Sequence, residues 1–289
     1  MAFAPDFNCA FIGFGLIAGS IAKAFRKYYP ACALSAYAPS GKNTTPAFTD
    51  GTLNKIMESV TDGISDGDLI ILCGPVTLNE DNMAIIAPHL KPGAILTDVG
   101  SVKGNIVRKA TELGISSSFI GGHPMAGSEK TGYAFATEDL LTDANYILTP
   151  TSENKKEDIE ALTGLLSILK CKIIITDVEK HDKATAAISH VPHLISACLV
   201  EMVMQEDSED GFMKEIAAGG FRDTSRIAAS SPTMWKQICE TNTENIIDLL
   251  ENYIGHLEEI KTHLEEKNFD EIANLFGKTG PYRESFKQF

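Results

Sequence analysis

Side chains that can move protons and bind anions gather in three segments of this 289-residue chain. The segments are 97–104 (TDVGSVKG), 121–132 (GGHPMAGSEKTG) and 188–235, which begins ISHVPHLI and ends GGFRDTSRIAASSPTMW. An imidazole titrates near neutral pH, and a guanidinium can bind both oxygens of a carboxylate through two hydrogen bonds. These residue types indicate proton transfer on a small substrate that carries carboxylates.

A glycine-rich turn, GFGLIAGS at 13–20, lies between an apolar run and a helical pattern. Gly13 permits a tight turn, Gly15 lets the backbone approach a pyrophosphate, and Ala18 lets the helix pack on the strand. The alternative is a generic glycine turn, but its place between a strand and a helix favours dinucleotide binding. The residues we expect to contact the dinucleotide are Gly13, Phe14, Gly15, Leu16, Ile17, Ser40, Lys42, Gly74 and Pro75.

The second strand ends without the acidic side chain that usually holds the ribose 2′-hydroxyl of NAD. Ala38 occupies that place, and Ser40, Lys42, Asn43 and Thr44 follow it. Hydrogen-bond donors and a positive charge could accept a 2′-phosphate, which a carboxylate would repel. The expected cofactor is therefore NAD(P)+, with NADP slightly favoured. The alternative is a polar loop beside which NAD binds without the acid.

The elements that must position these residues alternate between strands and helices up to about residue 176. Strand-like runs occupy 8–12, 33–37, 68–73, 94–98, 118–122, 145–148 and 172–176, and helical patterns include 16–28, 78–90, 103–113 and 155–169. Such alternation is typical of βαβ units. We predict an α/β fold with a Rossmann-type, doubly wound, mostly parallel sheet over residues 1–176.

The rest of the chain, 177–289, reads as an all-α domain with helices over 180–204, 212–230, 234–266 and 270–277. In 242–266 the apolar residues recur every three or four positions in a wide stripe. A stripe so wide on so long a helix indicates packing on both sides, within the domain or across a dimer. We expect this domain to form a homodimer and to close over the substrate.

Composition excludes several classes of function. A formal net charge of −14 argues against nucleic-acid binding, which depends on basic side chains. The charge-free apolar run at 7–22 is shorter than the ~20 residues of a spanning helix and lacks the basic flank of a signal peptide. The six cysteines are scattered, which is typical of reduced core residues. We expect a cytoplasmic protein with no membrane segment.

Four motifs in this order resemble the prephenate/arogenate dehydrogenase family of tyrosine biosynthesis. They are GxGLxxGS at the start, D-x-GSVK, GGHPMAGSE, and the pair SHxPH with F-R-D-x-S-R-IA-x-S-x-P-x-M-W, so the resemblance covers about residues 8–260. It implies oxidative decarboxylation of prephenate to 4-hydroxyphenylpyruvate, with hydride transfer to NAD(P)+. The chain matches the minimal two-domain form, without a regulatory domain or a fused mutase. L-tyrosine is a possible feedback ligand.

The resemblance also implies roles in catalysis. His123 would accept the proton of the substrate's 4-hydroxyl, and Ser101 would orient it. The alternative for His123 is a loop histidine bonded to the backbone. The alternative for Ser101 is an N-cap of a helix starting at Val102.

Substrate binding is implied for His193, Arg226, Glu129, His190 and Trp235. Each has an alternative. Arg226 could form a surface ion pair, His190 could be a satisfied core histidine, and Trp235 could pack in the core instead of reaching a neighbouring active site. Glu129 could gate access, distinguish prephenate from arogenate, or hold an arginine.

Two neighbouring features stay open. Arg222 either supports the site or pairs with Asp223. His190 and His193 would share a helix face, but no acid or cysteine completes a metal site at standard spacing, so no metal is expected. Pro192 between them should kink or start the helix.

Other functions remain possible at this point. Arogenate could be the preferred substrate, giving tyrosine directly. The two-domain plan also fits a 3-hydroxyacid dehydrogenase, although that plan usually carries a catalytic lysine where this chain has histidines. A non-catalytic, cofactor-sensing binding protein is the alternative from a different class.

Overall fold

The computed structural model describes residues 3–126 and 130–286. The chain divides into two compact units. The first comprises Met1–Thr185 with Ala229–Asn242, and the second comprises Ala186–Ala228 with Thr243–Phe289. The predicted division at residue 176 stays a prediction, because a division by contacts is not a test of evolutionary domains.

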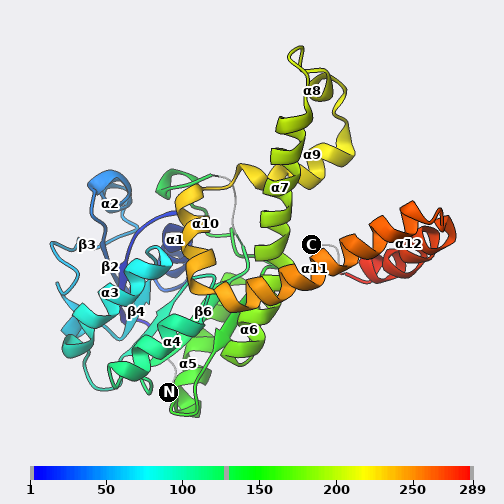
Figure 1. Ribbon diagram of the computed structural model, residues 1–289. Helices are drawn as coiled ribbons and strands as arrows, with labels where there is room; N and C mark the ends of the chain where they lie inside the picture. Colours follow the sequence, from blue (N-terminus) through cyan, green and yellow to red (C-terminus); the bar gives the residue numbers. More distant parts are fainter. Residues whose placement is uncertain (1–2, 127–129, 287–289) are drawn as a thin grey trace. The chain divides into compact units, whose positions relative to one another are not determined.

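The first unit is built on one eight-stranded sheet of order β3-β2-β1-β4-β5-β6-β7-β8 (Figure 1). The strands are β1 (Asn8–Ile12), β2 (Ala33–Tyr37), β3 (Lys55–Ile56), β4 (Leu69–Leu72), β5 (Ile95–Asp98), β6 (Phe119–Pro124), β7 (Asn145–Thr149) and β8 (Lys172–Ile175). All neighbouring strands pair in parallel except β6 and β7. Since the chain leaves β1 toward β2 and later returns to place β4 on its other side, the sheet is doubly wound. The predicted fold class is confirmed.

Helices cover both faces of this sheet. One apolar cluster joins the strands to α1 (Leu16–Tyr28) and α5 (Lys156–Leu166), and the other joins them to α3 (Val76–Ile86) and α4 (Gly104–Glu112). Every residue of β4 is buried, as expected of a central parallel strand whose two faces are both covered. The continuous apolar run at 69–72 therefore reflects its position in the middle of the sheet.

Three local features differ from the sequence-based expectations. The expected polar loop after β2 is the helix α2 (Gly41–Thr49). Helix α4 begins at Gly104 with Lys103 as its N-cap residue, so Ser101 is not an N-cap. The expected helix at 180–204 is α6 (Val178–Thr185), a π-helical turn (Ala186–His190) and α7 (Val191–Glu206). Pro192 lies in the first turn of α7, so the prediction that it starts a helix is confirmed.

The second unit is entirely helical in its described residues. It contains α7, α8 (Phe212–Ile216), α9 (Gly219–Ser225), α11 (Thr243–Glu265) and α12 (Phe269–Glu284). Helix α10 (Pro232–Thr241) belongs to the first unit and contacts α3.

Large apolar side chains of the second unit are exposed along several helices. They include Ile188, Met202, Met204, Phe212, Ile216, Ile247, Ile254, Leu257, Leu264, Phe269, Phe276 and Tyr282. The helical run Val178–Glu206 is also long and apolar enough to cross a membrane, judged by length and composition alone. Exposed apolar surface on this scale is typical of a face that another protein or a membrane covers.

Candidate active site

The glycine-rich turn connects β1 to α1 in the geometry that a bound diphosphate requires. Gly13 has a φ of 90°, and a Cβ there would lie 2.7 Å from the Gly74 nitrogen, so only glycine fits. Gly15 is the N-cap residue of α1, and a Cβ on it would meet no protein atom within 4 Å. The first turn of α1 carries no acidic side chain. The open space at Gly15 and the N-terminal end of α1 fit an anionic diphosphate.

The neighbouring residues lie around this turn in different ways. The Phe14 side chain is buried, stacked on Tyr133, so only its backbone faces the turn. Gly74 and Pro75 follow β4, which pairs with β1, and the Gly74 N–H donates to Asn79 Oδ1. Leu16 and Ile17 are partly buried in the first turn of α1.

The residues after β2 form the start of α2. Ser40 is its N-cap residue, and Ser40 and Lys42 are exposed. Asn43 Oδ1 accepts a hydrogen bond from the Tyr133 N–H, and Thr44 is buried. Of the four polar side chains singled out after Ala38, Ser40 and Lys42 are therefore the exposed ones.

Asp98, at the end of β5, joins the loop that carries Ser101 to the strand that carries His123. Its Oδ1 accepts from the Gly122 N–H at 3.0 Å, and its Oδ2 accepts from the Gly100 N–H at 2.9 Å and from the Lys103 ammonium. Asp98 and Lys103 are fully buried, and burial lowers the pKa of Lys103 while Asp98 opposes that shift. The sequence had singled out this segment, but not the ion pair within it.

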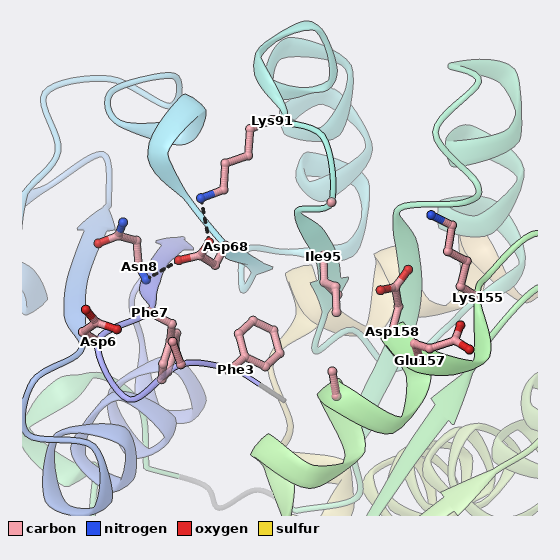
Figure 2. Close-up of a pocket in the computed structure, with 13 residues that line it drawn as sticks. Phe3, Asp6, Phe7, Asn8, Asp68, Lys91, Ile95, Lys155, Glu157 and Asp158 are labelled. Carbon is pink, nitrogen blue, oxygen red and sulfur yellow. Dashed lines mark hydrogen bonds and ion pairs between the residues drawn. The ribbon is translucent and has the colours of Figure 1, made fainter. Parts of the chain in front are cut away.

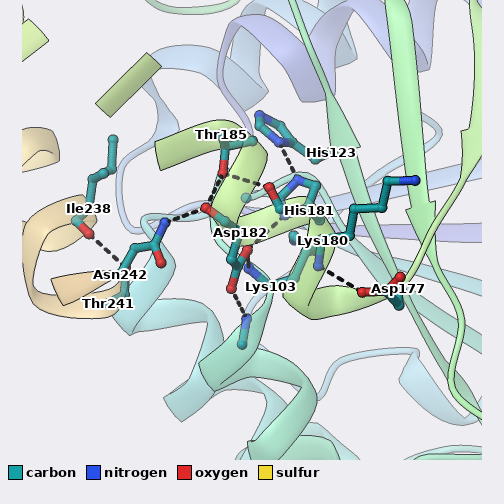
Figure 3. Close-up of polar contacts among 12 residues, drawn as sticks. Lys103, His123, Asp177, Lys180, His181, Asp182, Thr185, Ile238, Thr241 and Asn242 are labelled. Carbon is teal, nitrogen blue, oxygen red and sulfur yellow. Dashed lines mark hydrogen bonds and ion pairs between the residues drawn. The ribbon is translucent and has the colours of Figure 1, made fainter. Parts of the chain in front are cut away.

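His123 lies at the carboxyl end of β6 and is 9% exposed. Its Nδ1 is 2.9 Å from His181 Nε2, and His181 Nδ1 is 2.7 Å from Asp182 Oδ1 (Figure 3). Sequence reasoning missed His181 and Asp182. The signal that could have found them is the adjacent histidine and aspartate in the first turns of a helix.

These groups share one edge of the sheet. Gly13, Gly74, Ser101 and His123 follow or end β1, β4, β5 and β6, which are neighbours running in the same direction. Ligands of doubly wound folds bind at the carboxyl ends of the strands. The dinucleotide turn and the predicted proton acceptor therefore lie at the edge where this fold class binds ligands.

A separate pocket of about 690 Å³ lies at the opposite edge, beside the first residues of β1 and β5 (Figure 2). There the Asp68 carboxylate pairs with Lys91 at 2.6 Å and accepts from the Asn8 N–H at 2.8 Å. None of the predicted site residues lines this pocket.

The second unit holds three of the predicted residues. His190 is buried in the π-helical turn, as the core-histidine alternative expects. His193 is half-buried in α7, and its Nδ1 lies 2.8 Å from the Ser189 carbonyl oxygen. Arg226 is exposed after α9. Arg222 donates to the Ala217 carbonyl oxygen at 2.9 Å and does not pair with Asp223.

The remaining predicted residues lie elsewhere in the first unit or outside the described residues. Ser101 is half-buried in the loop after β5, and Trp235 is half-buried on α10. Glu129 lies outside the described residues. Within the described part of the chain, no group of three or more His, Cys, Asp or Glu side chains is arranged to hold a metal.

The fold and this sheet edge define a dinucleotide-binding protein with a histidine at its ligand-binding edge and a helical second unit. Family models described as the prephenate dehydrogenase nucleotide-binding domain and dimerization domain match residues 21–175 and 177–278. The chain therefore belongs to the prephenate dehydrogenase family, which confirms the resemblance seen in its motifs.

Individual relatives agree with this assignment. The chain is 34% identical over 277 residues to a prephenate dehydrogenase of Bacillus subtilis, covering 94% of this chain and 74% of the relative. A solved structure of Aquifex aeolicus prephenate dehydrogenase with hydroxyphenyl propionate and NAD+ is 26% identical, with a TM-score of 0.90 over 97% of this chain and 98% of that one. Synechocystis arogenate dehydrogenase is 30% identical, with a TM-score of 0.86 over 97% and 100%.

Proposed function

We propose that the protein catalyses the oxidative decarboxylation of prephenate to 4-hydroxyphenylpyruvate, a reaction of tyrosine biosynthesis. The observation that carries the proposal is His123 at the carboxyl end of β6, on the same sheet edge as the dinucleotide turn. Membership in the prephenate dehydrogenase family supports the substrate.

The chemistry needs little from the protein beyond orientation and charge. Bound NAD(P)+ supplies the hydride acceptor. As hydride leaves C4, the 4-hydroxyl proton passes to His123, and the ring carboxylate leaves as CO2 with its bonding electrons entering the ring. The proton then returns to the phenolate oxygen, so no net proton is released. Formation of the aromatic ring drives the reaction, and the site must hold substrate and cofactor in register.

The other predicted residues take supporting roles in this proposal. Arg226 binds a substrate carboxylate through its planar guanidinium, and His193 contacts the substrate. Ser101 orients the substrate hydroxyl toward His123. His190, Glu129 and Trp235 are assigned to the edge of the binding site, His190 as a buried support.

NADP+ is the proposed preferred cofactor. Ser40 and Lys42 are exposed at the N-terminus of α2, whose first turn carries no acidic side chain, so a 2′-phosphate would meet a positive charge and a favourable helix end. Lys42→Ala should raise the KM for NADP+ and leave the KM for NAD+ unchanged. A lower KM for NAD+ than for NADP+ in the unmodified enzyme would refute the preference.

Arogenate is the second candidate substrate, favoured by the likeness to the Synechocystis arogenate dehydrogenase. The two substrates differ in the side chain, where arogenate carries an ammonium group. An assay that crosses prephenate and arogenate with NAD+ and NADP+ gives the ratio of kcat/KM values, and adding L-tyrosine to the same assay tests it as a feedback ligand.

A homodimer in the cytoplasm is the proposed state. The exposed apolar side chains of α11 and α12 favour a second copy as the partner that covers them, and a matching dimerization-domain model supports it. Burial raises the pKa of the Cys9 and Cys73 thiols, which is typical of unreactive core cysteines in a reducing compartment.

The decisive experiment is cofactor reduction on adding prephenate, measured for the unmodified enzyme and for His123→Asn. We expect turnover by the former and a loss of about 100-fold or more in kcat for the latter, as for removal of a general base. Near-full turnover by His123→Asn refutes the role of His123. No turnover by the unmodified enzyme with either substrate would favour the cofactor-sensing alternative.

A further inference from the structure

A buried hydrogen-bond chain of three side chains, His123, His181 and Asp182, extends from β6 into α6 (Figure 3). The side chain of His181 is 0% exposed and that of Asp182 is 7% exposed. The two imidazole rings meet edge to face, with centroids 5.1 Å apart. Water therefore has little access to the bonds that join these groups.

The carboxylate of Asp182 sets the direction of the hydrogen bonds. Its Oδ1 accepts from the Lys103 N–H at 2.8 Å, and its Oδ2 accepts from the Gly104 N–H at 2.7 Å. These N–H groups open α4, where the helix dipole favours a negative charge. An ionised carboxylate can only accept, so His181 must donate to it from Nδ1.

This direction fixes the tautomer of both histidines. A neutral His181 that carries its proton on Nδ1 has only a lone pair at Nε2, so His123 must donate to it from Nδ1. A neutral His123 with its proton on Nδ1 has its lone pair on Nε2, the nitrogen that can accept a proton. The opposite tautomer of His181 would place two donors, Nδ1–H of His123 excluded, against the wrong partners.

We propose that His181 and Asp182 are positioning residues that hold His123 in the tautomer whose Nε2 accepts the substrate's hydroxyl proton. The inference rests on the proposed function, in which His123 is the proton acceptor. The same two residues stabilise the doubly protonated His123 ring, because its Nδ1–H donates into a chain that ends in a carboxylate.

Neighbouring contacts hold the chain in place. The Asn242 amide donates to the Asp182 carbonyl oxygen at 2.9 Å, and the Thr185 hydroxyl donates to the His181 carbonyl oxygen at 3.1 Å. The charged groups around the chain are Asp182 itself and the buried Lys103–Asp98 pair, whose opposite charges compensate each other. Asp182 therefore acts on His181 without a competing unpaired charge from that pair.

The first test reads the tautomer directly in the unmodified protein. Nitrogen-15 NMR of ring-labelled histidine distinguishes a protonated Nδ1 from a protonated Nε2, and His123→Asn and His181→Leu assign the two signals. We expect the Nδ1–H tautomer for both rings at neutral pH. An Nε2–H tautomer of His123 overturns the inference, whichever substrate the enzyme uses.

The second test is kinetic. His181→Leu removes the acceptor, whereas His181→Gln places an amide oxygen that can accept from His123 Nδ1. We expect His181→Leu to lower kcat by about 10- to 100-fold with KM changed by less than about twofold, and His181→Gln to recover most of the loss. The acid limb of the pH profile of kcat should move to lower pH in His181→Leu, since the doubly protonated His123 loses its stabilising partner.

Controls separate this role from a structural one. His89→Leu, at an exposed histidine of the same unit, should leave kcat and its pH profile unchanged. Equal kcat values for His181→Leu and His181→Gln, or an unshifted acid limb, overturn the inference even if both variants are less stable. If the unmodified enzyme oxidises neither substrate, the proposed function fails, and the tautomer measurement alone then decides whether the chain orders His123.

Discussion

Removing the charge of Asp98 is the sharpest test of how the site is held. Asp98→Asn keeps the size of the side chain and its Oδ1 acceptor for Gly122, but it leaves the Lys103 ammonium buried without its carboxylate. Uncompensated buried charges are strongly destabilising, typically by about 3–5 kcal/mol. The protein has one way to limit this loss, which is to release the Lys103 proton.

That release sets an upper limit which depends on pH. Neutralising a lysine of unfolded pKa ~10.4 at pH 7 costs about 4.6 kcal/mol, and at pH 9 about 1.9 kcal/mol. The sign follows from proton binding: the unfolded chain binds the Lys103 proton more tightly than the folded one, so stability lost in the variant returns as pH rises toward the unfolded pKa. The destabilisation by Asp98→Asn should therefore shrink markedly between pH 7 and pH 9.

Urea denaturation of the unmodified protein and the variant at both pH values measures this difference. Asp62→Asn is the matched control, because it removes the carboxylate of the exposed Lys55–Asp62 pair and should cost no more than about 1 kcal/mol at either pH. Asp98→Asn combined with Lys103→Met should be more stable than Asp98→Asn alone at pH 7. A loss at pH 7 as small as that of the control, or one independent of pH, would refute the reasoning.

Three further predictions follow from other parts of the structure. Gly15→Ala should leave the melting temperature unchanged but raise the Kd of the dinucleotide at least about tenfold, because its Cβ meets no protein atom, whereas Gly13→Ala should also lower the melting temperature; calorimetry and cofactor titration measure both. Although burial raises the pKa of Asp68, hydrogen bonds from Asn8 and Lys91 hold it below its usual range, so its stabilising contribution is present above an unfolded pKa of ~3.9 and is lost as pH falls through the folded value. Acid denaturation of Asp68→Asn should then start from lower stability and fall less steeply in that range. Leu257→Asp should shift the protein toward monomer in sedimentation velocity, and an unchanged sedimentation coefficient would argue against α11 as the interface.

Local sequence signals predicted most of the fold. The strands at 8–12 and 33–37 were placed to the residue, because apolar runs bounded by turn residues identify buried parallel strands without tertiary information. Helix α2 was missed. Its composition is poor for a helix and includes Pro46, but the buried Ala47 and the hydrogen bond from Tyr133 to Asn43 stabilise it in the folded protein.

The sequence by itself determined the class of fold and the residue types of the site. The glycine spacing at 13–20 and the position of His123 after a strand are local properties, since backbone geometry and strand order follow from neighbouring residues. The partners of His123 are not local. His181 is 58 positions away, and it reaches His123 only after β6 and α6 pack together in the folded unit.

Asp98 is similar, because the same carboxylate binds the loop at Gly100 and the next strand at Gly122. Hydrogen bonds between distant segments depend on distances of a few tenths of an ångström, which no local pattern of residues encodes. The tertiary structure therefore decided which groups orient His123, whereas the sequence had already determined that a histidine would stand at the dinucleotide-binding edge of the sheet.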